Sequence, residues 1–312
     1  MKPSATNALL PADAGDLRHE SALHAAIPEA LYELAELDVL YEERHASLWT
    51  FMRPAGRPSF TPAMLHDFER WQKLIGEGFG GSLEEGRVPL RYLVLGSRAP
   101  QVFCYGGDLE LFQQLIRTRD RDALIRYGHR CCAILHRNIE TLGLDMLTIG
   151  LVQGAALGGG FEALLSFDVI IAERQAVFGL PEIMFGLFPG MGAHALLARK
   201  LGSAMADRLI LSNKTYTAEE LHELGLVDAL AEPGDGVNAV REFIKRSERR
   251  HAGLVGARRA TKAVWALELA ELNRITELWA DAALQLGEQD LKVMSRLVAA
   301  QGRVVERSAA AA

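Results

Sequence analysis

Short apolar segments alternate with amphipathic ones along most of the chain. Residues 37–42 and 46–52 are mainly apolar and flank the polar run Glu43 to His45, which predicts two strands joined as a hairpin. Thr61 and Pro62 suit the N-cap and the first position of a helix. That helix carries apolar residues at helical spacing, namely Met64, Leu65, Phe68, Trp71 and Leu74. The pattern therefore predicts a strand pair followed by an amphipathic helix.

The middle of the chain continues with strands and helices in turn. We expect buried strands at 91–96, 148–153 and 169–172, a helix at 109–116 capped by Asp108, and a long helix at 121–142. Most of the remaining chain has a helical pattern. Strands and helices that alternate in this way favour parallel β-α-β units with right-handed crossovers.

Three consecutive glycines, Gly158 to Gly160, stand between an apolar strand and a run that continues as a helix. Glycine lets the backbone approach a ligand closely. Free N–H groups at the start of a helix stabilise negative charge, including a developing oxyanion. Glu162 follows two residues later and could move protons beside that charge. The pattern indicates an anion-stabilising site with a carboxylate next to it.

The wider pattern resembles the crotonase (enoyl-CoA hydratase/isomerase) superfamily. The superfamily's Gly-x-Ala-x-Gly-Gly-Gly-x-Glu is matched at Gly154 to Glu162, its Pro-Glu at 181–182 and its Phe-Pro-Gly-x-Gly at 188–192. Phe103 to Leu109 is similar to its Phe-x-x-Gly-Ala-Asp-Leu loop, with glycine in place of alanine, and 211–228 is similar to the segment that closes its core. Four motifs in this order are a specific signal, which covers about residues 37–233.

One branch of the superfamily is more similar to this chain than the hydratases are. Residues 106–112, 180–192 and 274–288 look like the corresponding segments of the diffusible-signal-factor synthases, which make cis-2-unsaturated fatty acid signals. That resemblance implies dehydration of a 3-hydroxyacyl thioester, followed by thioester hydrolysis that releases the free acid. The Asn-Ala-Leu that hydratases carry after an early Arg-Pro is absent, and Arg53 to Pro62 stands there instead.

The resemblance also implies an α/β fold of repeated ββα units, with a C-terminal helical region that covers the active site. We expect a flexible tail at 1–30, the crotonase core at 31–233, the helical region at 234–307 and a short tail at 308–312. The superfamily commonly forms trimers and hexamers, so a homo-oligomer of either size is expected.

Four residues carry the implied chemistry. The backbone N–H groups of Gly107 and Gly159 would form an oxyanion hole for the thioester carbonyl, and Glu162 and Glu182 match the two catalytic glutamates of the superfamily. Taken alone, each is explained by an ordinary turn, a first-turn helix charge or a solvated loop carboxylate. Within the four motifs, the pair points to the removal or addition of water across C2–C3, because two neighbouring carboxyls can share one proton.

The acyl chain needs an apolar pocket close to these groups. The candidates for substrate binding are Leu157, Gly158, Met184, Phe185, Gly190 and Trp279. For any one of the apolar side chains, a place in the core or in a subunit contact is an equally good explanation. Trp279 is the best single candidate because the synthase resemblance is closest around it. Cys104 is not expected to act as a nucleophile, since no histidine is paired with it in a recognisable motif.

Composition adds limits to this interpretation. The 312 residues are 49% hydrophobic with a net charge of −6, and they show no aromatic-basic stripe that would bind nucleic acid. The three cysteines have the spacing of neither a disulfide framework nor a zinc site. The start of the chain lacks an apolar signal region and no segment has 18 uninterrupted apolar residues. We expect a soluble, cytoplasmic protein without metal or bound cofactor.

The carrier of the thioester is left open between coenzyme A and an acyl carrier protein, because both present phosphopantetheine. An acidic carrier protein would need a basic surface. One basic group contains Arg117, Arg119, Arg121, Arg126, Arg130 and Arg137, and a second contains Lys245, Arg246, Arg249, Arg250, Arg258, Arg259 and Lys262. A solvated helix face explains each group equally well. The sequence identifies no regulatory protein partner.

Three functions remain open at this point. Signal synthesis by dehydration and thioester hydrolysis is favoured, and an enoyl-CoA hydratase of fatty-acid breakdown is the alternative. A non-catalytic binding protein with a crotonase-like fold is a third possibility, but it would have no need of the two glutamates and the oxyanion glycines.

Overall fold

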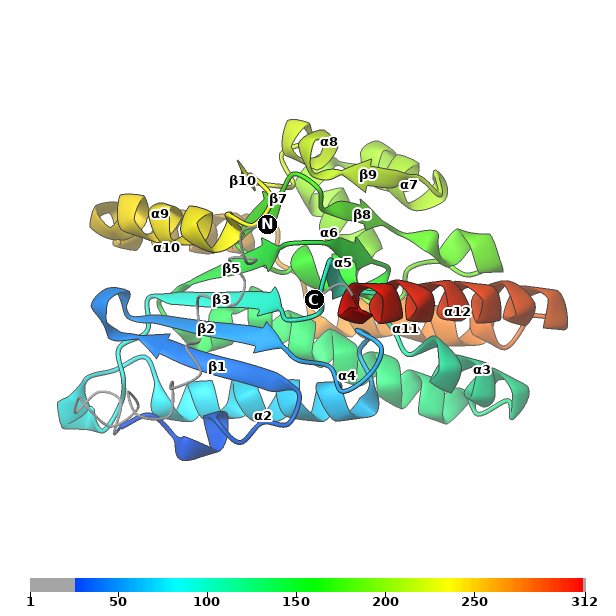
Figure 1. Ribbon diagram of the computed structural model, residues 1–312, viewed down its shortest axis with the longest axis horizontal. Helices are drawn as coiled ribbons and strands as arrows, with labels where there is room; N and C mark the ends of the chain where they lie inside the picture. The colour runs from blue at the N-terminus through cyan, green and yellow to red at the C-terminus, as the bar shows by residue number, and fades with distance from the viewer. Residues whose placement is uncertain (1–25, 311–312) are drawn as a thin grey trace.

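Two sheets form the centre of the molecule in the computed structural model, which describes residues 26–310 (Figure 1). The larger sheet has the strand order β1 (Leu37–Glu42), β2 (Ser47–Met52), β3 (Tyr92–Ser97), β5 (Leu147–Val152), β7 (Val169–Glu173) and β10 (Ala229–Ala231). The smaller sheet has the order β4 (Val102–Cys104), β6 (Ala155–Leu157), β8 (Val177–Gly179) and β9 (Thr215–Thr217). Only β1 and β9, at the edges, run antiparallel to their neighbours.

The chain repeats a ββα unit, which contributes one strand to the larger sheet, one strand to the smaller sheet and then one or two helices. Each of these units is one turn of the chain. The helices of these turns are α3 (Leu109–Arg117) with α4 (Arg121–Ile139) after β3 and β4, α5 (Gly159–Leu164) after β5 and β6, and α6 (Ala193–Leu201) after β7 and β8. The α/β class with repeated ββα units is therefore confirmed. The hairpin of β1 and β2 precedes these turns and is followed by α2 (Pro62–Gly78).

Two apolar cores lie on the two faces of the larger sheet. The larger core fills the space between this sheet, α2, α4 and the smaller sheet. The smaller core lies under α9 (Gly236–Ser247) and α10 (His251–Val264), where Val240 and Ile244 pack on Trp49 and Ile149. The remaining short helices, α7 (Ser203–Leu211) and α8 (Ala218–Glu223), flank β9.

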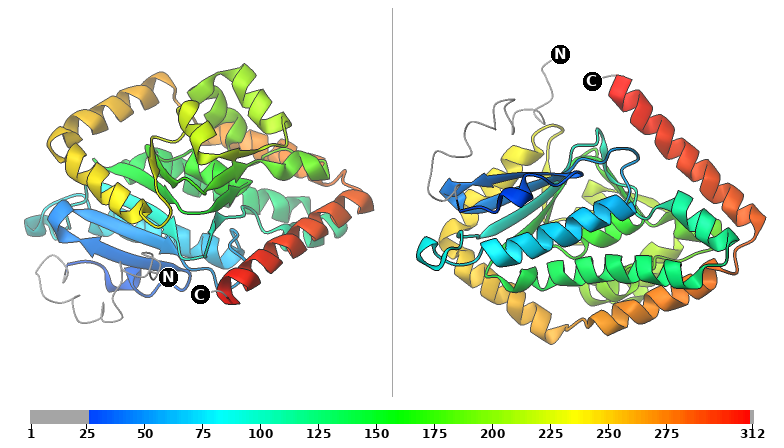
Figure 2. Two further views of the ribbon diagram at one scale, coloured as in Figure 1. Left: turned by 45° about the horizontal axis from the view of Figure 1, so that its top comes forward. Right: turned by 90° about the horizontal axis from the view of Figure 1, so that it is seen from below.

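Two C-terminal helices close one side of the molecule. In Figure 2, right, α2, α4 and α11 (Leu269–Ala283) follow one another, and α12 (Glu288–Ala310) lies at the edge. The α11 helix packs on α4 where Gly128 leaves room for Thr276. The α12 helix packs on α3 and on η7 (Pro181–Phe185), a 3₁₀ helix after β8.

The sequence-based boundaries differ from the structure in a few places. The helix expected at 121–142 ends at Ile139, because Thr141 and Leu142 adopt positive φ angles of 49° and 54° and turn the chain toward β5. Five three-residue strands, β4, β6, β8, β9 and β10, were not expected, since a pattern of period two needs a longer segment to be visible.

Parts of the two expected tails lie outside the described residues, namely 1–25 and 311–312. Ile27, within the expected N-terminal tail, is buried in the larger core, and η3 (Glu29–Leu31) follows it. Residues 308–310 form the end of α12. Within residues 26–310, no helix combines the length and the apolar character that crossing a membrane requires.

Candidate active site

The two oxyanion glycines lie where the loop after β4 crosses the start of α5. A Cβ atom at Gly106 would stand 2.5 Å from the backbone N of Gly159, and Gly106 has a φ of 86°, so only glycine allows this crossing. A Cβ atom at Gly159 would stand 3.5 Å from the N of Gly107. The N–H groups of Gly107 and Gly159 therefore lie close together, and neither donates a hydrogen bond to another residue of the described chain.

Hydrogen bonds fix the loop that carries Gly107. The N–H of Phe60 donates to the carbonyl of Gly106 at 2.7 Å. The hydroxyl of Tyr127 donates to the carbonyl of Phe60 at 2.5 Å and accepts from the N–H of Asp108 at 3.2 Å. The side chain of Asp108 in turn caps α3. Because the loop is held on both sides, the N–H of Gly107 is preorganised for a developing charge.

Glu162 is buried in α5 and is held by backbone donors. Its Oε2 accepts hydrogen bonds from the N–H groups of Met191 at 2.9 Å and Ala193 at 2.8 Å. Burial raises the pKa of Glu162 to about 7, and the bonds from Ala193, Met191 and Gly192 oppose this rise by favouring the charged form. The turn at 191–193 therefore binds the Glu162 carboxylate in a fixed position.

Glu182 lies in η7, and the backbone donor near its carboxyl is its own N–H. Its Oε2 atom is buried and finds no hydrogen-bond partner among the described residues. Burial, together with the charge of Glu162, raises the pKa of Glu182 to about 8. The two carboxyls are therefore unequal, because backbone donors favour the charged form of Glu162 while burial favours the neutral form of Glu182.

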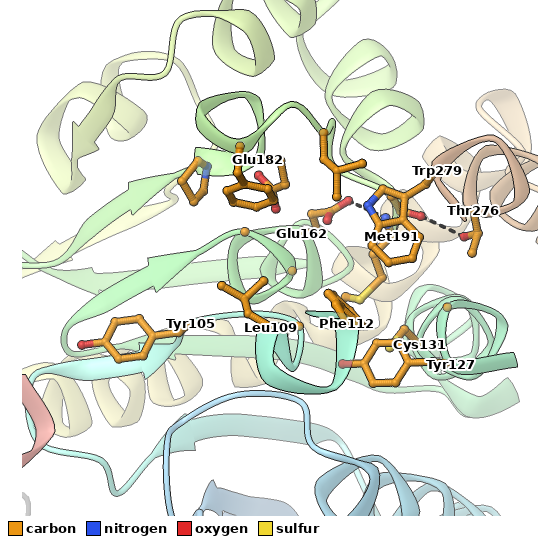
Figure 3. A pocket seen from close by; sticks show the side chains of 18 of the residues that line it. Tyr105, Leu109, Phe112, Tyr127, Cys131, Glu162, Glu182, Met191, Thr276 and Trp279 are labelled. Carbon is orange, nitrogen blue, oxygen red and sulfur yellow. Dashed lines mark hydrogen bonds between the residues drawn. The ribbon is translucent and has the colours of Figure 1, made fainter. Parts of the chain in front are cut away.

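One cavity joins these groups (Figure 3). Gly107, Gly159, Glu162 and Glu182 all line it. Figure 3 places Tyr105 to one side of the two glutamates, and Thr276 and Trp279 to the other. Its apolar wall contains Leu109, Phe112, Tyr127, Phe185, Leu187 and Trp279. The structure therefore brings the four expected chemical groups into one largely apolar chamber.

The expected substrate-binding residues divide into two groups. Gly158, Phe185, Gly190 and Trp279 line the cavity, whereas Leu157 and Met184 are not among its lining residues. The side chain of Met184 is turned outward and the residue is 53% exposed, because η7 directs its neighbours Glu182 and Phe185 inward instead.

Sequence reasoning missed the contribution of α3 and α4 to the site. Phe112, Tyr127 and Cys131 line the cavity from these two helices, and Met191 lines it from the turn that holds Glu162. The helical spacing of apolar residues showed that α3 and α4 have a buried face. It could not show that this face points at the glutamates, since that depends on how the helices pack.

Trp279 connects the C-terminal helices to the site. A Cβ atom at Gly190 would stand 2.5 Å from Cγ of Trp279, so the indole lies directly on this glycine. The rings of Trp279 and Phe112 meet edge to face at 5.0 Å. One helical turn earlier, the hydroxyl of Thr276 donates to the carbonyl of Gly190 at 2.8 Å. Through these contacts α11 supports the turn that binds Glu162.

A second cavity adjoins the first. The two share Cys131 and Met191 as lining residues, and the second cavity extends between α2, α4, α5 and the larger sheet. Its lining is almost entirely apolar, with Phe60, Phe68, Trp71, Leu95 and Phe103 among its residues. Apolar space thus continues beyond the chamber that holds the two glutamates, on the far side of Met191.

Cys104 lies directly before the loop that carries Gly106 and Gly107, but its thiol does not have the properties of a nucleophile. The thiol is fully buried, and burial raises its pKa to about 12, so it carries no charge at neutral pH. Its Sγ accepts a hydrogen bond from the N–H of Gly106 at 3.3 Å, which supports the loop. Within residues 26–310, His, Cys, Asp and Glu side chains nowhere gather in threes as metal ligands would.

Many members of the two basic groups form ion pairs within the chain. In the first, Arg117 pairs with Glu288, Arg121 with Asp281 and Arg130 with Glu69. In the second, Lys245 pairs with Glu242, Arg258 with Asp228, Arg259 with Asp145 and Lys262 with Asp168. These internal pairs reduce the positive charge that either surface offers to a partner.

Comparison with known proteins identifies relatives of the chain. The model of the enoyl-CoA hydratase/isomerase family matches residues 77–285. A short-chain-enoyl-CoA hydratase of Clostridium acetobutylicum is 38% identical over 208 residues, which cover 67% of this chain and 74% of that protein. A peroxisomal fatty acid β-oxidation multifunctional protein of Arabidopsis thaliana is 34% identical over 142 residues, or 45% of this chain, and these span only 19% of its length.

Solved structures show the same fold. The enoyl-CoA hydratase of Bacillus halodurans superposes with a TM-score of 0.70 at 20% identity, covering 83% of this chain and 98% of that one. DspI of Pseudomonas aeruginosa superposes with a TM-score of 0.61 at 23% identity, covering 74% of this chain and 81% of that one. At these identities the likeness extends to the fold alone.

Proposed function

The chain belongs to the enoyl-CoA hydratase/isomerase family, and from that premise we propose that it makes a 2-unsaturated fatty acid signal. The reaction begins with a 3-hydroxyacyl thioester, removes water across C2–C3, and then hydrolyses the enoyl thioester to the free acid. The observation that carries this proposal is the unequal carboxyl pair: two backbone N–H groups hold Glu162, whereas Oε2 of Glu182 has no hydrogen-bond partner among the described residues.

Dehydration needs a polarised carbonyl and one proton on the pair. The N–H groups of Gly107 and Gly159 would bind the thioester oxygen and stabilise the charge that develops when C2 loses its proton. One glutamate accepts this proton as the carboxylate, and the other, as the neutral acid, protonates the C3 hydroxyl, which leaves as water. Burial raises both pKa values toward neutral pH, so a neutral and a charged carboxyl can coexist in the pair under these conditions.

Hydrolysis of the enoyl thioester can use the same groups. A glutamate carboxylate accepts a proton from water while the water oxygen bonds to C1, and the oxyanion hole binds the resulting tetrahedral anion. The anion then collapses, the C1–S bond breaks, and the sulfur leaves as a thiol after taking up a proton. No covalent intermediate with the protein is required, which agrees with the inert state of Cys104.

Sequence supports the synthase branch, and the cavities are consistent with its substrate. Residues 106–112, 180–192 and 274–288 resemble the diffusible-signal-factor synthases. The first of these segments carries Gly107, the second Glu182, and the third Trp279, so all three meet at one chamber. The second apolar cavity beyond Met191 offers room for further methylene groups of an acyl tail.

A second candidate function is reversible hydration of enoyl-CoA in fatty-acid breakdown. It is favoured by the 38% identity to the short-chain-enoyl-CoA hydratase. It uses the same oxyanion hole and the same two carboxyls, but it ends without cleavage of the thioester. The release of free acid is therefore the event that separates the two functions.

Product analysis tests the proposal. Purified protein is incubated with 3-hydroxyacyl thioesters of several chain lengths on coenzyme A and on acyl carrier protein, and the products are identified by mass and double-bond geometry. We expect a free cis-2-unsaturated acid from at least one carrier. If only the enoyl and 3-hydroxyacyl thioesters interconvert, the hydratase function replaces the proposal. If neither reaction occurs, a non-catalytic binding function replaces both.

A further inference from the structure

One polar side chain in the catalytic chamber has no part in the chemistry above. Gln301 of α12 lines the chamber and is 5% exposed. Its Oε1 atom is buried and accepts no hydrogen bond from any residue that the structure describes. A buried amide oxygen without a donor is unfavourable for folding. Such an atom in a binding cavity is therefore suited to a donor that arrives with the ligand.

The pattern of α12 makes the residue more conspicuous. The helix faces the protein with Leu291, Met294, Leu297 and Val298, so Gln301 continues an apolar stripe at helical spacing. An apolar residue of similar size at this position would complete the stripe and leave no polar atom unpaired. The amide thus interrupts the pattern only where the helix reaches the chamber.

Contacts along α12 place Gln301 beside the oxyanion loop. The start of α12 lies at the end of α3, where Glu288 pairs with Arg117. Further along, the hydroxyl of Ser295 donates to Oε1 of Gln113 at 2.7 Å. The two helices therefore run in opposite directions, and the next turns of α12 lead toward the start of α3. Gln301 accordingly lines the chamber together with Tyr105, Gly107 and Leu109.

The two ends of the chamber differ in chemistry. Trp279 and Thr276 lie at one side of the glutamates and Tyr105 at the other (Figure 3). Apolar space continues past Met191 into the second cavity, which suits an alkyl chain. The thioester carbonyl would lie at Gly107 and Gly159, with the acyl tail directed toward the second cavity. The sulfur and its carrier arm would then leave on the opposite side, past Tyr105 and Gln301.

We propose that Gln301 binds the pantetheine arm of the thioester, with its Oε1 accepting a hydrogen bond from the first amide N–H of that arm. This inference rests on the proposed function only in assuming a pantetheine thioester as the ligand. The arm is peptide-like, and its first amide stands two methylene groups from the sulfur. Gln301 is then a binding residue that aligns the thioester with the oxyanion hole from the carrier side.

The test compares two ligands that differ at one atom. One is a 3-hydroxyacyl N-acetylcysteamine thioester, which carries the first amide of the arm, and the other is the matching S-(4-oxopentyl) thioester, in which CH₂ replaces the N–H. Their dissociation constants are measured by calorimetry with the Glu182→Gln protein, which keeps the bonds from the turn at 191–193 to Glu162, so the result does not depend on which reaction the site performs. Gln301→Met and Ser295→Ala are compared on this background.

We expect the protein with Gln301 to bind the amide ligand about tenfold more tightly than its CH₂ analogue, as one hydrogen bond allows. Gln301→Met should bind the two equally, with an unchanged or higher melting temperature because the unpaired oxygen is gone. Ser295→Ala loosens the contact between α12 and α3 without touching the chamber, and it should keep the tenfold preference.

Three results would overturn the inference. The first is that the protein that keeps Gln301 binds the two ligands equally. This result can be interpreted without the Gln301→Met protein. The second is a full preference retained by Gln301→Met. The third is an equal loss of preference in Ser295→Ala, which would reduce Gln301 to a contact that docks α12. The product analysis above can fail while the preference is present, so the two proposals stand or fall separately.

Discussion

The carboxyl group of Glu182 lies directly against Gly158. A Cβ atom at position 158 would stand 2.7 Å from Oε1 of Glu182, closer than real Cβ contacts come. Gly158 also has a φ of 52° and donates its N–H to the carbonyl of Gly179 at 2.8 Å, which ties the turn to β8. The glycine therefore fixes how near the Glu182 carboxyl can lie to the start of α5.

Gly158→Ala should displace Glu182 and lower the dehydration rate by about 100-fold, since a shift of about 1 Å in a catalytic group can cost that much. Steady-state kinetics with a 3-hydroxyacyl thioester measures the loss. Gly76→Ala is the matched control, because its added methyl group meets nothing within 4 Å and Gly76 is not among the buried residues of α2. Normal turnover by folded Gly158→Ala would show that the position of Glu182 is not critical.

Glu162→Gln and Glu182→Gln should each reduce dehydration by about 100-fold to 10,000-fold, the usual contribution of a general acid or base. Both variants keep the shape of the side chain, so we expect them to fold, as circular dichroism would verify. Glu162→Gln should disturb the turn at 191–193 as well, because an amide offers one acceptor oxygen and adds a donor there. A variant with near-normal turnover would remove its residue from the mechanism.

The carboxyl pair should make the folded protein less stable as pH rises. Burial raises the pKa of Glu162 to about 7 and that of Glu182 to about 8, so the native state holds protons that the unfolded chain has lost above about pH 4.5. Stability then falls as pH increases from about 5 to 8, by about 1.4 kcal/mol for each pKa unit. Melting curves should show wild type losing stability over this window relative to the Glu162→Gln, Glu182→Gln double variant. Parallel pH profiles would contradict the shifted pKa values.

Gly107→Pro and Cys104→Ala separate backbone from thiol chemistry. Proline has no N–H, so Gly107→Pro should abolish activity on every thioester substrate. Cys104→Ala should retain turnover within a few-fold, since its buried thiol is uncharged at neutral pH. Initial rates on one thioester compare the two variants. A folded but inactive Cys104→Ala protein would instead support covalent catalysis.

Trp279→Ala should shift the preferred acyl chain length upward. The indole fills the space between Gly190 and Phe112 at the acyl side of the chamber, and its removal leaves apolar volume there. The variant should lose about 3 to 5 kcal/mol of stability, as truncation of a buried aromatic residue does. Competition between 3-hydroxyacyl thioesters of different length measures the preference. An unchanged preference with the expected loss of stability would make Trp279 a purely structural residue.

The sequence by itself determined the class of the fold and predicted the candidate groups of the site. The motifs of the site are local signals. They are the three consecutive glycines, the carboxylate that follows them and the Pro-Glu of 181–182, and each indicates the backbone shape or the charge at its own position. The same holds for Thr61 and Asp108, which begin α2 and α3 with their side chains as the N-caps. Local patterns could therefore predict both the elements and the candidate groups.

Only the tertiary structure decided how these groups meet and which neighbours tune them. The backbone donors at Met191 and Ala193 are 29 and 31 residues from Glu162, and no local pattern links them. Met184 and Phe185 are adjacent and both apolar, yet one is exposed and the other lines the chamber. Gln301 lies in a helix whose pattern predicts burial but not what is buried beside it. Packing of distant segments sets these relationships, because side-chain direction and burial depend on the three-dimensional arrangement of the helices.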